Sequence, residues 1–341
     1  MIQLHVWGKD NDVSVISPAS IAATWLLNLT LTSQGVPFEV VTSNNTNLSS
    51  INELPVLIVS ETEKYSGYNE IVSYVEENFK SEEYLGSKSM DSRQKLLNRT
   101  LQNMLTSKIQ YINQYNLYSN TKNYVKFTRK LFASYFPFPM MYNQPSKYHN
   151  QAQEQIKLLG LSKNQVSFFN FISGSNEDLE VAQTEIFNDE ISDDDEEDDE
   201  VAISSLHEKQ LLKKSKTKQV LKESKNSMRC LILINHYINE VVKVYEKNGG
   251  DKDDNKLGFI FGNSPSSSEL LFYAYIQCLT SDKLPDRFIY NYLLLKQPEV
   301  LKFINETTEN YSSDVKFRDP TGIEVPSLFN EIGYLMGSIK Y

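Results

Sequence analysis

Apolar and polar positions alternate at the start of the chain, and a helical spacing follows. Residues 2–7 (IQLHVW) alternate with a period of two, which predicts a half-buried first strand. Ser17 is a favourable N-cap residue and Pro18 suits the first turn of a helix, where its missing N–H costs nothing. Together with the helical spacing of apolar residues up to Leu29, they predict a helix after the first strand.

The next 50 residues read as short strands followed by a second helix. Pro55 opens one of these strands, a position that suits proline because a strand start needs no N–H donor. A turn at Ser66 and Gly67 then leads into a helix with an apolar face that ends near Phe79. The predicted strands cover residues 36–41, 54–59 and 63–65. The order strand, helix, strand, strand, strand, helix predicts an α/β domain over residues 1–82.

From about residue 90 the apolar residues recur every three or four positions, which predicts helices. Residues 270–279 are apolar almost all round, so we expect them to form the central buried helix. Ser266 and Glu269 form a capping-box pattern just before it, in which each side chain bonds to the other residue's amide. The sequence therefore predicts an all-α C-terminal domain over residues 90–341.

A strongly charged insertion, at about residues 174–217, interrupts this second domain. The chain has 341 residues and a formal net charge of −10, yet residues 177–200 alone hold 14 acids and no base. Seven lysines follow between residues 209 and 225. Such charge density with few apolar residues favours disorder. We favour a solvated loop, and leave open a contact between its two halves or steering of a charged partner.

Several classes of function and location find no support in the sequence. The folded part is nearly neutral and no nucleic-acid-binding motif is present, so nucleic acid is not expected as a partner. Two cysteines give no disulfide framework, and no signal peptide, presequence or apolar run of membrane-spanning length is found. Four histidines, His5, His149, His207 and His236, lack metal-ligand spacing, and the acidic run lacks the pattern of a calcium loop. No metal and no cofactor is expected.

Six strings of residues resemble a known family: HVWGKD, SNNTNLSSINELPVLIV, YSGYNEIVSYV, NTKNYVKFTRKLF, FPMMYNQPSKYHNQA and FRDPTGIEVPSLFNEIGYL. They are similar to the fungal metaxin-like family, most of all to the larger metaxin-like subunit of the mitochondrial sorting and assembly machinery (SAM complex). The resemblance implies a thioredoxin-like domain followed by an all-helical domain, the glutathione-transferase-like architecture. It also implies that Pro55 is the cis-proline of that fold.

The same resemblance implies a non-enzymatic subunit on the cytosolic face of the mitochondrial outer membrane. Its expected partners are a BamA-like β-barrel subunit, a second metaxin-like subunit, a receptor of the import translocase and β-barrel precursors. The implied role is to help precursors insert, fold and leave the machinery, and to couple it to the translocase.

A glutathione-dependent transferase or peroxidase is the main alternative. Such an enzyme needs a hydroxyl near the first helix to stabilise a thiolate, and Ser14 and Ser17 are the nearby candidates, Ser17 being favoured as a plain N-cap. Where transferases bind the glutamyl end of glutathione, this chain carries Gly67, Tyr68 and Glu70, and the bulky tyrosine argues against a ligand. A transferase-like regulatory domain of a translation factor would lack the strings above, so we rank it last.

An aromatic segment over residues 135–142 is the candidate partner-binding site. Prolines are expected to keep it from being helical, so it is either core packing, which we favour, or an anchor for a partner. Its candidate contact residues are Phe136, Phe138, Met140, Met141 and Tyr142. The amphipathicity of residues 324–341 is too weak to decide whether they touch a membrane. Pro55, Ser66, Gly67, Ser266 and Glu269 are expected to have structural roles.

Overall fold

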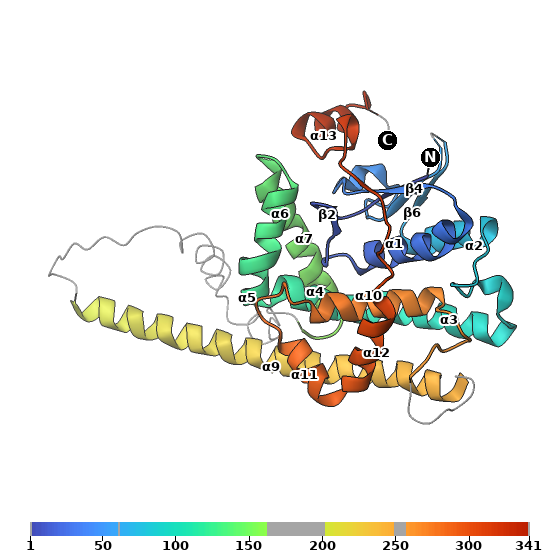
Figure 1. Cartoon of the computed structure of the whole chain (residues 1–341). Helices are drawn as coiled ribbons and strands as arrows, with labels where there is room; N and C mark the ends of the chain where they lie inside the picture. Colours follow the sequence, from blue (N-terminus) through green and yellow to red (C-terminus); the bar gives the residue numbers. More distant parts are fainter. Residues whose placement is uncertain (1, 61, 162–201, 249–256, 340–341) are drawn as a thin grey trace. The chain divides into compact units, whose positions relative to one another are not determined.

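The structure is a computed structural model that describes residues 2–60, 62–161, 202–248 and 257–339 (Figure 1). The chain divides into two compact units. The first comprises Met1–Leu161 and Arg229–Tyr341, and the second comprises Ser162–Met228. Everything that follows on packing and on the site concerns the described residues of the first unit.

A mixed five-stranded sheet lies at the N-terminal end of the first unit. Its strand order is β6-β5-β1-β4-β7, with β1 parallel to β4 and antiparallel to β5. Leu4 lies at its centre, opposite Val40 on one side and Leu57 on the other. The strands of the first unit are β1 (Ile2–His5), β2 (Gly8–Lys9), β3 (Asp12–Val13), β4 (Phe38–Val41), β5 (Val56–Ile58), β6 (Lys64–Ser66) and β7 (Phe317–Arg318). This order, with its crossover helix between β1 and β4, is the thioredoxin-like arrangement that we expected.

The helices follow the predicted order. The N-terminal helices are α1 (Pro18–Leu31) and α2 (Tyr68–Asn78). The other described helices are α3 (Ser92–Met104), α4 (Gln110–Gln114), α5 (Thr121–Asn123), α6 (Arg129–Tyr135), α7 (Met140–Lys157), α9 (Ala202–Asn248), α10 (Ser267–Thr280), α11 (Phe288–Lys296), α12 (Pro298–Thr308) and α13 (Leu328–Leu335). Three π-helical turns, Leu105–Ile109, Tyr115–Ser119 and Tyr124–Thr128, join α3, α4, α5 and α6. The fold is therefore α/β at its N-terminal end and chiefly helical afterwards, a glutathione-transferase-like architecture.

Helices α1 and α10 pack against each other and join the sheet to the helical part of this unit. All residues of α1 except Ala19 are buried, because the sheet and α2 cover one side and α10 packs on another. The apolar segment predicted as the central helix is α10, and every residue from Leu270 to Leu279 except Gln277 is buried. As predicted, Ser266 is its N-cap, and the Glu269 carboxylate accepts the N–H of Ser266 at 2.9 Å.

Three expectations are corrected by the structure. The first strand is not half-buried, since His5 and Trp7 on its supposed polar face are both buried. The second domain is not entirely helical, because strand β7 lies within its residue range and pairs with β4 in the N-terminal sheet. In the charged insertion, residues 174–201 lie outside the described residues, but the chain is helical from Ala202 onward, where we expected disorder up to residue 217. Lys, Leu, Gln and Glu, which dominate that stretch, are strong helix formers.

Candidate functional site

The Ser17 hydroxyl at the start of α1 caps this helix. Ser17 is the N-cap: its Oγ accepts the N–H of Ser20 at 3.3 Å and lies 2.8 Å from the Oγ of Ser20. The side chain is buried, and both of these contacts are with another serine. A serine nucleophile needs an adjacent base or a lowered pKa. The geometry therefore matches the capping role that the sequence favoured, and neither of these contacts supplies a base to Ser17.

The start of α2 is likewise occupied by internal contacts. The Leu54–Pro55 peptide bond is cis, as the resemblance implied, and the carbonyl of Pro55 accepts the N–H of Gly67 at 2.8 Å. Gly67 has φ +80°, a conformation that favours glycine. Tyr68 is buried, and its hydroxyl donates to the carbonyl of Ser267 at 2.8 Å.

Two further polar groups at this end of α2 are bonded within the protein. The carboxylate of Glu70 accepts the N–H of Ser66 at 2.7 Å, and the Oγ of Ser66 accepts the N–H of Ser50 at 3.1 Å. Gly67, Tyr68 and Glu70 are the positions that the resemblance aligns with the glutamyl-binding residues of a transferase. Here Tyr68 ties α2 to α10, and Glu70 ties α2 to β6.

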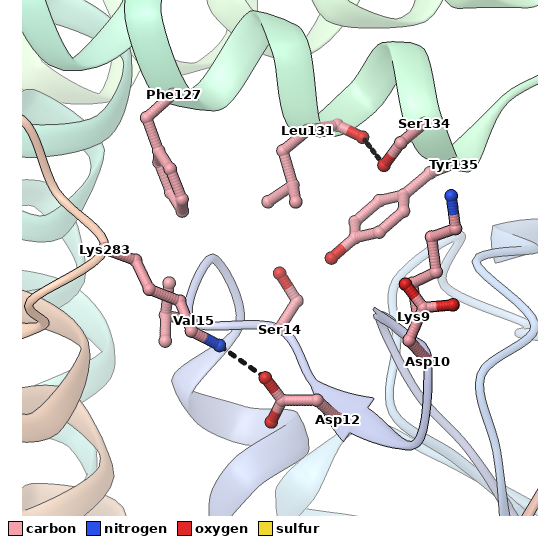
Figure 2. A pocket seen from close by; sticks show the side chains of 10 residues that line it. All are labelled: Lys9, Asp10, Asp12, Ser14, Val15, Phe127, Leu131, Ser134, Tyr135 and Lys283. Carbon is pink, nitrogen blue, oxygen red and sulfur yellow. Dashed lines mark hydrogen bonds and ion pairs between the residues drawn. The ribbon is translucent and has the colours of Figure 1, made fainter.

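A cavity of about 360 Å³ opens between the β2–β3 hairpin and α6 (Figure 2). One wall is apolar and the rim is charged, with an ion pair between Lys283 and Asp12. Burial raises the pKa of Tyr135 to about 12, so its phenol is neutral at pH 7. The lining residues are Lys9, Asp10, Asp12, Ser14, Val15, Phe127, Leu131, Ser134, Tyr135 and Lys283. None of these ten is a cysteine or a histidine, so the cavity has no thiol or imidazole for nucleophilic chemistry.

Both cysteines are remote from solvent. Cys230 on α9 and Cys278 on α10 are free thiols and fully buried. Burial raises the pKa of each thiol well above its usual value, so both are protonated at neutral pH. They pack in the core as small apolar side chains.

The predicted aromatic segment is divided between core and surface. Phe136 and Met140 are buried, and Phe136 packs edge-on against Trp7 with ring centroids 5.9 Å apart. Phe138 and Tyr142 are 77% and 58% exposed and contact each other at a centroid distance of 6.2 Å. The segment is also partly helical, because α7 begins at Met140. Core packing, which we favoured, is thus right for Phe136 and Met140 and wrong for Phe138 and Tyr142.

The last helix, α13, carries exposed apolar side chains that the sequence left undecided. Phe329 and Leu335 are 86% and 76% exposed, and no residue of this helix is buried. Its single charged residue, Glu331, accepts the Nδ2–H of Asn47 at 3.0 Å. A narrow cleft lined by Met140 and Gln144 of α7 and by Glu331 of α13 shows that the two elements adjoin, and Figure 1 draws them at the same end of this unit.

We call this surface the apolar end and define it by its exposed side chains. They are Phe138, Tyr142, Leu328, Phe329, Ile332, Leu335 and Met336. The stretch of chain that contains α6 and the start of α7 is basic. Residues 92–153 contain nine lysines and arginines and no acid, in a chain whose net charge is −10. Lys126, Lys130 and Lys147 of this stretch are exposed.

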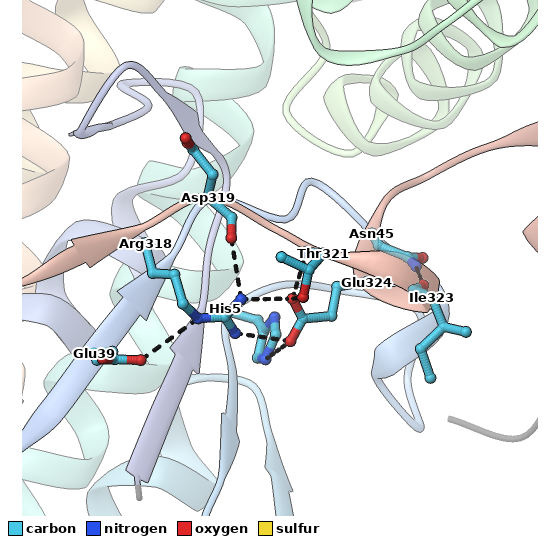
Figure 3. A network of polar contacts seen from close by, with 8 residues as sticks. All are labelled: His5, Glu39, Asn45, Arg318, Asp319, Thr321, Ile323 and Glu324. Carbon is cyan, nitrogen blue, oxygen red and sulfur yellow. Dashed lines mark hydrogen bonds and ion pairs between the residues drawn. The ribbon is translucent and has the colours of Figure 1, made fainter.

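The segment before α13 is held against the sheet by a polar network (Figure 3). Arg318 of β7 donates two hydrogen bonds to the carboxylate of Glu324, at 2.9 and 2.8 Å, and lies 3.5 Å from Glu39 of β4. Burial alone would raise the pKa of Glu324, but the hydrogen bonds from Arg318 and from the N–H of Thr321 hold it below its usual value. We call residues 316–326 the strap, because they cross from the helical part back to the sheet.

His5 lies beneath the strap with its Nε2 4.0 Å from Glu324. Burial lowers the pKa of His5 to about 4, despite the opposing effect of Glu324. The imidazole is therefore neutral at pH 7 and the two side chains are not an ion pair. Neither ring nitrogen has a hydrogen-bond partner.

The remaining sequence expectations concern metals and membranes. In the part of the chain that the structure describes, no group of three His, Cys, Asp or Glu side chains could hold a metal ion. No described helix combines the length and the apolar character needed to cross a bilayer.

Comparison with known proteins places the chain in a family. The family model described as "Outer mitochondrial membrane transport complex protein" (Tom37) matches residues 20–149, and the "Tom37 C-terminal domain" model matches residues 187–339. Metaxin-1 of Macaca fascicularis is 28% identical over 125 residues, 37% of this chain and 38% of that protein. Human Metaxin-1 is 28% identical over 125 residues, 37% of this chain and 26% of its own length. The Drosophila melanogaster Metaxin-1 homolog is 26% identical over 156 residues, 46% of this chain and 45% of its own length.

The matched region thus spans less than half the length of these relatives. Among solved structures, a glutathione S-transferase of Ceriporiopsis subvermispora in complex with glutathione is similar at a TM-score of 0.45 and 10% identity, covering 91% of this chain and 97% of that one. A Burkholderia glutathione transferase homolog with bound glutathione has a TM-score of 0.24 and 16% identity, covering 46% of this chain and 94% of that one. The two family models together match more than four fifths of the chain, which belongs to the metaxin family.

Proposed function

We propose that this chain is a non-enzymatic subunit of the sorting and assembly machinery of the mitochondrial outer membrane. In this role it helps β-barrel precursors insert, fold and leave the machinery, and it couples the machinery to the import translocase. The observation that carries the proposal is the match of both Tom37 models over most of the chain.

The arrangement of the transferase-like positions supports a binding role over catalysis. Ser17 caps α1, and Tyr68 and Glu70 are bonded inside the protein. The buried thiols are protonated, and no cysteine or histidine lines the cavity beside α6. No observation favours the glutathione-dependent alternative that uses Ser17.

The proposed partners are a BamA-like β-barrel subunit, a second metaxin-like subunit, a receptor of the import translocase and β-barrel precursors. The proposed location is the cytosolic face of the outer membrane, with peripheral attachment. Of the five predicted contact residues, Phe138, Tyr142 and the half-buried Met141 remain available at the surface. Phe136 and Met140 are buried in the core, so we no longer propose them as partner contacts.

Affinity purification of the tagged full chain from mitochondrial membranes in mild detergent tests this role. We expect mass spectrometry to recover a BamA-like barrel protein and a second metaxin-like chain with it. The Ser17→Ala variant should recover both equally well, since the hydroxyl is only a cap. Recovery of neither protein, together with retention of the chain on a glutathione matrix, would reverse the proposal in favour of the enzyme.

A further inference from the structure

We propose that the apolar end is a membrane-contact surface that binds an anionic phospholipid bilayer. This inference rests on the proposed function, which brings the chain to a membrane, and adds the surface that touches it and the lipid chemistry that it selects. It draws on the exposure of the apolar end, the charge of the helices beside it and the shape of α13.

The apolar end is larger than the scattered apolar residues that any protein exposes. It gathers seven exposed apolar side chains from the α6–α7 turn and α13, two elements that meet at the cleft lined by Met140 and Glu331. Glu331 is the single charged residue of α13, and its carboxylate is half-buried and accepts the Nδ2–H of Asn47, so the exposed side chains of this helix are mainly apolar. Exposed apolar side chains gathered on two adjoining elements in this way favour a site of interaction.

The surrounding charge favours lipid headgroups over a protein as the occupant. Lys126 and Lys130 lie on the turns that lead toward the apolar end, and Lys147 lies two turns into α7 and lines the cleft beside α13. Protein interfaces are depleted in lysine, whereas apolar and aromatic side chains flanked by lysines are typical of surfaces that lie on anionic membranes. Lysine can keep its ammonium group among headgroups while its stem lies along apolar surface.

The dimensions of α13 fit contact along a bilayer. Eight residues make a helix about 12 Å long, far short of the roughly 30 Å of the hydrocarbon core. The strap fixes its position, because Arg318 holds Glu324 and the Nδ2–H of Asn330 donates to the carbonyl of Val325 at 2.8 Å. A helix held in advance loses less conformational freedom when it binds.

Vesicle flotation of the full chain tests the inference. One set of vesicles is phosphatidylcholine alone, and the other is an equimolar mixture of phosphatidylcholine and phosphatidylinositol. We expect the chain to float with the mixed vesicles and much less with phosphatidylcholine alone, and high salt to weaken binding because it screens the headgroup charge. Flotation with neither set, or equally with both, would overturn the proposal.

Two variants probe the two parts of the surface. The double variant Phe138→Ser and Phe329→Ser should lower the vesicle-bound fraction about tenfold or more, since each ring contributes apolar contact. The triple variant Lys126→Gln, Lys130→Gln and Lys147→Gln should lower it at least as far on mixed vesicles. All five side chains are exposed, so we expect both variants to fold, and circular dichroism checks this.

Control variants carry changes of the same kind elsewhere on the same unit. Leu295→Ser on α11 removes an apolar side chain that is 81% exposed, and Lys243→Gln, Lys296→Gln and Lys302→Gln remove three exposed lysines. Figure 1 draws α11 and α12 at the opposite end of this unit from α13. These controls should float like the unchanged chain, and a loss equal to that of the test variants would overturn the proposal.

The outcomes separate this inference from the proposed function. A chain that recovers the barrel subunit from detergent but does not float with vesicles overturns the membrane surface alone. A chain that floats as expected but recovers no barrel subunit overturns the assembly role alone. If the variants lose a protein partner while the unchanged chain does not float, the apolar end is a protein interface and the inference is wrong.

Discussion

A histidine without a hydrogen-bond partner lies in the middle of the sheet, beneath the strap. Both ring nitrogens of His5 are unpaired, and burial lowers its pKa from 6.5 to about 4. The unfolded chain therefore binds a proton at His5 between these two pH values, whereas the folded chain does not. Stability linked to His5 is fully present above pH 6.5 and is lost as the pH falls toward 4.

The variant His5→Leu should weaken this acid sensitivity. A shift of this size is worth about 3 kcal/mol of unfolding free energy between pH 7 and pH 4. Urea unfolding at both values should show that the variant loses less stability on acidification by up to that amount. Part of the acid loss should remain, because the pKa of Glu324 is also lowered. Identical pH profiles for both proteins would show that His5 is not the group responsible.

Replacing Ser17 by alanine tests the assignment of its hydroxyl to capping. The change removes the acceptor for the N–H of Ser20, and loss of an N-cap costs about 1 kcal/mol. Urea unfolding should show that decrease, while recovery of the partner subunits stays unchanged. The exposed Ser134→Ala is the matched control and should leave stability within about 0.5 kcal/mol. A variant as stable as the unchanged chain would contradict the capping role.

At the scale of elements, the helices and long strands were predictable because their patterns are local. The alternation in residues 2–7, the cap at Ser17 and the capping box at Ser266 each lie within a few residues of the element that they define. The hairpin β2–β3 and strand β7 have two residues per strand, too few to show a period. Strand β7 also pairs with β4 more than 270 residues earlier in the chain, a contact that no local pattern encodes.

The candidate site was predictable only in composition. The sequence shows that residues 135–142 are aromatic, but the burial of Phe136 and the exposure of Phe138 depend on how α6 ends and α7 begins. The apolar residues of α13 were visible too, yet their exposure depends on contacts between distant parts of the chain, such as that of Glu331 with Asn47. A charge count by region would have found the basic stretch at residues 92–153.

The strap is the element whose stability we expect to depend most on one side chain. Arg318→Gln removes two hydrogen bonds between charged groups, so we expect a loss of about 1–2 kcal/mol in unfolding free energy. The N–H of Val40, which donates to the carbonyl of Lys316 at 2.8 Å, should exchange faster with solvent. Both are measurable, by urea unfolding and by hydrogen exchange followed by mass spectrometry.

An exposed ion pair on α12 provides the control for the strap. Lys302→Gln breaks a contact of 3.8 Å to Glu306, and such pairs contribute about 0–1 kcal/mol. It should leave the exchange of Val40 unchanged. If Arg318→Gln also left that exchange unchanged, the strap would be held by its remaining contacts and not by Arg318.

At the scale of the whole molecule, the N-terminal domain proposed over residues 1–82 is tied to the helical part at several points. Helix α1 packs on α10, and the Tyr68 hydroxyl donates to the carbonyl of Ser267. Trp25 and Asn28 of α1 donate hydrogen bonds to Ser312 and to the carbonyls of Tyr311 and Ser313. Residues 1–161 and 229–341 accordingly form a single compact unit.

We therefore predict that residues 1–82 do not fold when expressed alone. Without the rest of the chain, the buried Trp25 of α1 would lose its contacts with Tyr311 and Ser312, and β4 would lose β7 at the sheet edge. Burying a side chain of this size contributes about 1.5–3 kcal/mol, a large share of the stability of so small a domain. Thermal unfolding followed by circular dichroism should show no cooperative transition for the fragment and one for the full chain. A cooperative transition of the fragment would instead mean that the thioredoxin-like half is an independent domain, and that the contacts of α1 with α10 join two units that are each already stable.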